Sequence, residues 1–225
     1  MKEPSSEAEP EDPLSSGAFA DIFHHMKGGD TVAHTIVRDD LQSLQEYGNQ
    51  RQQYIRDMIE KKNQRRVRLA PDVSLLFENK DTVLYQIQEL IFGEDLENES
   101  EIAEYIDIYS PMLPGDNELS GTLFIEMDNQ EKLEEMLARL KGIENHLYMQ
   151  IGNERIQAVF EEEHDDREFT TSVHYLKFPL TPSAAKAMTS DTGVVVKLVL
   201  DHPELQADMK LDPATIASLG KDLQA

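Results

Sequence analysis

The spacing of apolar residues differs between the two halves of this chain, and that difference limits the folds available to it. Between Thr35 and Tyr109 most apolar residues recur three and four positions apart, as on one face of a helix. Pro111 and Pro114-Gly115 end this pattern, and short alternating or β-branched stretches follow. Strands and helices do not alternate regularly. The sequence therefore predicts an α+β fold, with N-terminal helices packed on a mainly antiparallel β-sheet.

Residues that begin and end helices refine this prediction. We expect Asp39 or Asp40 to cap the first helix, a break near Gly48, and Asn79 or Asp81 to cap a later helix. The expected helices are residues 39–47, 49–64, 80–92, 100–109, 130–140 and 182–188, with a last helix from 213. The expected strands are residues 67–69, 73–77, 119–127, 146–151, 155–160, 170–178, 193–200 and 205–211.

The first 34 residues differ from the rest in composition. Residues 1–16 are rich in Pro, Ser and Glu, which predicts a disordered tail. Residues 17–27 carry four apolar side chains with the spacing of one helix face: Phe19, Ile22, Phe23 and Met26. A helix this short is marginal alone in water, so it packs either on its own domain or on another protein. We expect residues 1–34 to be a tail with a docking helix at about 17–27, and residues 35–225 to form a single α+β domain.

Composition excludes several classes of protein. The chain has no cysteine, which rules out disulfides, thiolate metal sites and a cysteine nucleophile. It has 44 acidic and 21 basic residues and a formal charge of −23, so we expect no binding to nucleic acid. No apolar run reaches the length of a membrane span, and the N-terminus does not look like a secretory leader. We therefore expect a cytoplasmic protein without membrane association.

Common catalytic motifs are also absent. The sequence contains neither a GxGxxG nor a GxxxxGK[ST] phosphate loop, no GxSxG nucleophile elbow and no HExxH zinc motif. These absences leave open whether the protein is an enzyme.

One candidate metal site remains. His146 begins one expected strand, His174 lies within another and His202 follows a third, while Glu126 ends a strand of the same expected sheet. Two or three imidazoles and a carboxylate would suit Fe, Mn or Zn with an open coordination position. His146 and His174 could share a sheet face only if the strand register permits it, and each histidine could instead be an ordinary residue with its own hydrogen bond.

A basic segment provides a second candidate site. Arg65, Arg66 and Arg68 lie within a short stretch that also contains two lysines. On an acidic protein such a patch could bind a phosphate, a carboxylate or another small anion. These bases could equally end a helix, where cations are favoured, and pair with the protein's own acids.

Six segments follow one another in an order typical of one bacterial family: residues Arg65–Glu89, Leu113–Gly115, Glu118–Glu126, Gly142–His146, Ser172–Phe178 and Asp201–Pro203. On these segments the chain resembles the domain-of-unknown-function family DUF3501, over about residues 36–210, and the first 34 residues lie outside that pattern. Genes of this family often lie beside those of rubrerythrin-like proteins and iron–sulfur oxidoreductases. The resemblance therefore implies an accessory role in redox or oxidative-stress handling, without assigned catalytic residues.

The leading hypothesis is an accessory or adaptor protein that docks on a larger partner through its N-terminal amphipathic segment. The resemblance suggests a rubrerythrin-like or iron–sulfur oxidoreductase system as that partner. The alternative is a metal-dependent redox or hydrolytic enzyme that uses the His/Glu site, and a third reading is a small-anion binder that uses the three arginines.

Overall fold

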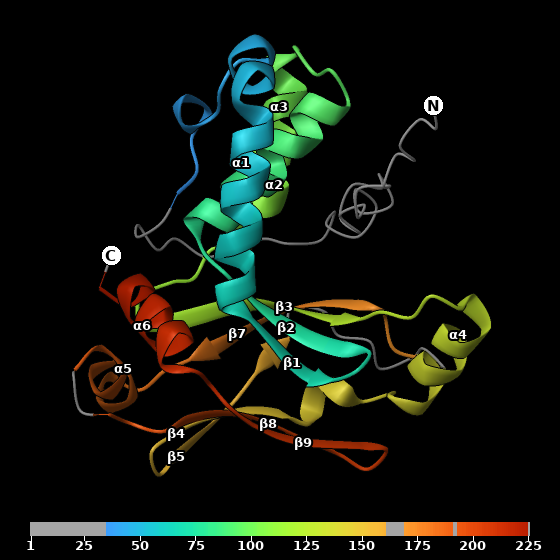
Figure 1. Cartoon of the computed structure of the whole chain (residues 1–225), viewed down its shortest axis with the longest axis vertical. Coiled ribbons are helices and arrows are strands. Elements are labelled where there is room, and N and C mark those ends of the chain that lie inside the picture. Colours follow the sequence, from blue (N-terminus) through green and yellow to red (C-terminus); the bar gives the residue numbers. More distant parts are fainter. Residues whose placement is uncertain (1–34, 161–168, 191–192, 225) are drawn as a thin grey trace, which may run out of the picture.

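The structure is a computed structural model that describes residues 35–160, 169–190 and 193–224. The tail and docking helix expected within residues 1–34 lie outside the described residues. The described chain has an α+β fold, as the sequence predicts (Figure 1). Its α-helices are α1 (Leu44–Arg65), α2 (Lys80–Gly93), α3 (Glu99–Tyr109), α4 (Gln130–Arg139), α5 (Pro182–Thr189) and α6 (Pro213–Asp222). Short 3-10 helices are η3 (Arg38–Asp40), η4 (Ser110–Met112) and η5 (Ile143–Asn145).

The strands form two antiparallel sheets rather than the single sheet expected. The first sheet has the order β1-β2-β3-β7-β6 and the second has the order β5-β4-β8-β9. The strands are β1 (Arg66–Ala70), β2 (Val73–Glu78), β3 (Glu118–Ile125), β4 (Leu147–Ile151), β5 (Glu154–Gln157), β6 (Val159–Phe160), β7 (Val173–Pro179), β8 (Val196–His202) and β9 (Leu205–Lys210). Alternation along a strand shows which residues share a face, but it does not show to which sheet the strand belongs.

One stretch of chain takes part in both sheets. β5 pairs with β4 in the second sheet, and β6 pairs with β7 in the first. Ala158 alone separates β5 from β6, and its N–H donates to the carbonyl of Leu147 at 2.9 Å. The two sheets are therefore joined along a nearly continuous strand.

The main core lies between the sheets. Leu75 and Phe77 of β2 and Phe178 of β7 belong to the same buried cluster as Leu147 and Met149 of β4. Apolar side chains of α4, α5 and α6 extend this cluster. Burial of these side chains is the main stabilising contribution to the fold.

The three N-terminal helices form a separate layer. Figure 1 shows α1, α2 and α3 rising together away from the sheets, with α6 near the lower end of α1. Val83 and Ile87 of α2, Ile102 of α3 and Tyr175 of β7 belong to a second buried cluster. Hence this second cluster connects the helices to β7 of the first sheet.

The first long helix differs from its prediction. Residues 44–65 form one continuous helix, capped by Ser43 rather than by Asp39 or Asp40. The Ser43 hydroxyl accepts from the backbone N–H of Glu46, whose carboxylate accepts from the Ser43 N–H, which is a capping box. The expected break near Gly48 is wrong. Gly48 lies in the helix where a Cβ atom would be 3.1 Å from the Phe92 ring, so its lack of a side chain allows close packing on α2.

The remaining boundaries are close to the predictions, and Asn79 is confirmed as the N-cap of α2. Across the described ranges, no helix has both the length and the apolar character that a membrane span requires.

Candidate functional site

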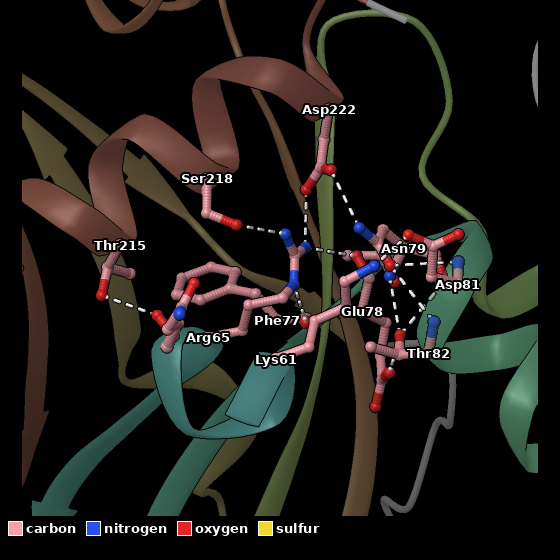
Figure 2. Close-up of polar contacts among 12 residues, drawn as sticks. Lys61, Arg65, Phe77, Glu78, Asn79, Asp81, Thr82, Thr215, Ser218 and Asp222 are labelled. Carbon is pink, nitrogen blue, oxygen red and sulfur yellow. Dashed lines mark hydrogen bonds and ion pairs between the residues drawn. The ribbon is translucent and has the colours of Figure 1, made fainter. Parts of the chain in front are cut away.

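Among the predicted site residues that the structure describes, Arg65 is the most enclosed. It is 1% exposed, and its guanidinium donates to the carbonyls of Phe77 (2.9 Å) and Glu78 (3.1 Å). It also donates to the Ser218 hydroxyl at 3.0 Å and to the Asp222 carboxylate at 2.5 Å (Figure 2). These four contacts join the end of α1, the end of β2 and helix α6. The side chain thus faces the interior rather than the surface where an external anion would bind.

The other two arginines lie on one face of β1. Arg66 donates to the Ser74 hydroxyl at 2.9 Å, stacks on the Phe124 ring at 4.9 Å, and lies 3.7 Å from the Glu126 carboxylate. Arg68 donates to the backbone carbonyl of Pro71 at 2.6 Å. The structure thus brings Arg66 and Arg68 together and separates them from Arg65. The anion site remains a prediction.

A buried carboxylate lies beside the Arg65 cluster. Glu78 is 3% exposed and accepts from the hydroxyls of Thr82 (2.5 Å) and Thr122 (2.8 Å). Asn79 connects it to the Arg65 contacts, because its amide donates to Asp222 at 3.1 Å (Figure 2). A carboxylate supplied with hydrogen bonds in this way costs less to bury than a bare one. The arrangement fixes the β2–α2 junction, where the sequence indicates only a helix cap.

The two candidate metal-binding histidines lie on different sheets. His146 precedes β4, and its Nδ1 is 3.1 Å from the Asp201 carboxylate while its ring meets the His202 ring edge-on at 5.1 Å. His174 lies in β7 and is 3% exposed, with Nε2 3.0 Å from the Thr170 hydroxyl.

The third predicted ligand, Glu126, faces Arg66 instead of either histidine. Among the residues that the structure describes, no three His, Asp or Glu side chains come together in a group that could hold one metal ion. Arg155 shares the Asp201 carboxylate with His146. Burial opposes ionisation of Asp201, but these two hydrogen bonds hold its pKa below the usual value. The structure therefore brings His146 together with His202, which the sequence also offered as a third imidazole, and with Asp201, which it did not.

A pocket between α1 and α2 is a further candidate site, and the sequence does not indicate it. It has a volume of about 250 Å³, and we call it the α1–α2 pocket. Its apolar and aromatic lining consists of Tyr47, Tyr54, Met58, Leu84 and Tyr85. Its polar lining consists of Asp40, Gln42, Asp57, Lys61, Asp81 and Gln88. The spacing of apolar residues in each helix predicts a buried face. The way in which α1 and α2 cross leaves a pocket at part of that face, and the spacing does not encode the crossing.

Hydrogen bonds between the helices hold the pocket wall in place. The Tyr47 hydroxyl donates to Glu89 at 2.5 Å, and Arg51 donates to both oxygens of the same carboxylate at 2.9 and 2.8 Å. Burial raises the pKa of the Tyr47 phenol, and the bond to Glu89 raises it further. The Gln88 side chain accepts from the backbone N–H of Gln42 (2.8 Å) and donates to its carbonyl (3.3 Å). The pocket is therefore formed before any occupant arrives.

Comparisons with known proteins agree with this architecture. The family model of DUF3501, described as a protein of unknown function, matches residues 35–223. A crystal structure of a protein of unknown function from Burkholderia pseudomallei K96243 is similar, with a TM-score of 0.79 and 33% identity. The similarity covers 84% of this chain and 100% of that one. The comparison with curated proteins found no match.

Proposed function

The chain belongs to the DUF3501 family, and on that basis we propose that it is an accessory protein that docks on a larger protein through Phe19, Ile22, Phe23 and Met26. One observation carries this proposal. The family match begins at residue 35, and 84% of this chain matches a solved relative over that relative's full length. A relative with this fold thus matches the chain without the amphipathic segment, which supports a role for the apolar stripe outside the domain.

The chemistry of the partner comes from the family resemblance. A rubrerythrin-like protein or an iron–sulfur oxidoreductase is the proposed class, and the protein would act in a redox or oxidative-stress system. Four large apolar side chains on one short helix are the kind of anchor that fills a groove on a partner. The proposed role requires no reaction by this chain.

Binding to purified candidates tests the proposal. A rubrerythrin-like protein and an iron–sulfur oxidoreductase from the source organism are immobilised, and binding of the full chain is compared with that of residues 35–225. The double variant Phe19→Ser, Phe23→Ser should weaken binding to one of them at least about tenfold, because buried apolar anchors carry most of such an affinity. The control Asp21→Ser, His25→Ser alters residues outside the stripe and should change binding less than about twofold.

Two results would contradict the adaptor role. The first is partner binding by residues 35–225 with unchanged affinity. The second is a markedly lower free energy of unfolding after the deletion while binding persists, which would make the segment part of the fold only.

A further inference from the structure

The α1–α2 pocket has the character of a receptor for side chains rather than for a cofactor. Its volume of about 250 Å³ is below the roughly 300–1,000 Å³ of sites that hold a small molecule. Tyr54 is 38% exposed at the pocket, whereas Met58 is 9% exposed. Large apolar side chains from a docked helix would fit these surroundings.

The place where the described residues begin indicates which segment would occupy the pocket. The described chain starts at Thr35, and Asp40, only five residues later, lines the pocket. Residues 28–34 separate the amphipathic segment from Thr35, and seven extended residues span up to about 25 Å. A segment held on so short a connection experiences an effective concentration near the millimolar range, which favours the intramolecular contact.

Charge at the edge of the pocket agrees with this occupant. Asp40 pairs with Lys80, and Asp81 pairs with Lys61. Asp57 accepts a hydrogen bond from the Gln53 amide at 2.6 Å, but it has no ion pair within the described ranges. Lys27 directly follows the apolar stripe of the segment and would supply a cation there.

We propose that the α1–α2 pocket binds residues 17–27 of the same chain and holds the segment until a partner displaces it. This inference rests on the proposed function, since it concerns the availability of that same docking segment. The partner must then compete with the pocket, so changes that weaken the internal contact strengthen binding to the partner.

The composition of the chain permits a direct test. It contains no tryptophan, so the substitution Phe23→Trp places a single fluorescent reporter in the segment of the full chain. We expect acrylamide quenching of this tryptophan to be several-fold weaker than in a synthetic peptide of residues 15–29 with the same substitution. Excess unsubstituted peptide should restore strong quenching by competing for the pocket. Equal quenching in the chain and in the free peptide would overturn the inference.

Matched variants locate the contact. Leu84→Glu, at the pocket, should expose the reporter, whereas Ile59→Glu, on the same pair of helices but outside the pocket lining and 51% exposed, should not. Circular dichroism checks that both variants fold, and Tyr54→Ala replaces Leu84→Glu if the latter does not. An unchanged reporter in a folded pocket variant would overturn the inference.

The two proposals can fail separately. If the reporter is exposed but the stripe variants still lose the partner, the docking role stands and the internal contact is wrong. If the reporter is protected but no candidate partner binds, the internal contact stands and the docking role is wrong.

Discussion

Arg65 and Asp222 are 157 residues apart in sequence, and their side chains form an ion pair in which the guanidinium is 1% exposed. The pair joins the last residue of the first long helix to the last residue of α6. Two backbone carbonyls at the end of β2 and the Ser218 hydroxyl complete the guanidinium's hydrogen bonds. A buried charge supplied with partners in this way is tolerated, but it becomes costly when one partner is removed.

Arg65→Ala should therefore lower the free energy of unfolding by about 3–5 kcal/mol, because Asp222 and two carbonyls would lose their donor. Arg68→Ala is the matched control, since Arg68 is exposed and bonded to a single carbonyl. It should change the free energy by no more than about 0.5 kcal/mol. Urea denaturation of both variants measures the difference. Equal effects would show that the Arg65 contacts are not what joins α1 to α6.

Tyr47→Phe should change how stability depends on alkaline pH. The pKa of a tyrosine in an unfolded chain is about 10, and the Tyr47 pKa in the folded protein is higher. The raised pKa of Tyr47 adds to the free energy of unfolding. This contribution is complete below about pH 10 and is lost as pH rises toward the folded pKa, because the tyrosine of the unfolded state releases its proton first. At neutral pH the variant should be less stable by about 1 kcal/mol through loss of the bond to Glu89.

Urea titrations from pH 7 to pH 11 test this sign. The difference in free energy of unfolding between the unsubstituted protein and Tyr47→Phe should narrow above about pH 10. The other tyrosines are present in both proteins, so their titration does not affect this difference. A gap that stays constant, or widens with pH, would mean that the folded pKa of Tyr47 is not raised.

Two glycine substitutions should give different results. At Gly93 a Cβ atom meets nothing within 4 Å, so Gly93→Ala should stabilise the protein by about 0.5 kcal/mol. At Gly48 the Cβ would lie 3.1 Å from the Phe92 ring, so Gly48→Ala should be less favourable. In a Phe92→Leu background that penalty should disappear. Thermal unfolding compares the unsubstituted chain, the three single variants and the Gly48→Ala, Phe92→Leu double variant. Equal gains in stability at both glycines would show that α1 and α2 are not closely packed at Gly48.

Substitution of His174 and of His146 should have different effects on stability. His174 is buried against Thr170 and the Phe160 ring, so His174→Ala should destabilise by about 1–3 kcal/mol. His146 is partly exposed, and His146→Ala should lower the free energy of unfolding by about 0.5 kcal/mol.

Elemental analysis of protein purified without a histidine tag or chelator should find well below one Fe, Mn or Zn per chain. A stoichiometric metal that is lost in the double variant would instead favour the metal-enzyme alternative.

The sequence predicted local structure better than it predicted the sites. Asn79 was identifiable as a cap because it precedes an apolar helical pattern, and the glycines and prolines marked most boundaries. The Ser43 capping box was missed, although a serine followed by Glu46 three residues later is its usual signal. The predicted helix break at Gly48 was wrong because the glycine allows close contact with the Phe92 ring, which is 44 residues away in sequence.

The site residues depended on long-range packing. Arg65 and Arg66 are neighbours in sequence, yet one lies at a helix end and points inward while the other begins a strand and faces Glu126. His146 and His174 could be combined only under the expectation of a single sheet. Strand alternation does not encode the division into two sheets, and the α1–α2 pocket depends on a helix crossing that neither helix specifies alone.

The strand shared by β5 and β6 restricts how this protein can move. Moving the two sheets apart would break the hydrogen bonds that β5 and β6 make on either side of Ala158. A hinge motion between the sheets would therefore require partial unfolding. Both sheets should exchange their slowest amide hydrogens as one unit. Any reversible rearrangement on the millisecond scale is then confined to the helices above them.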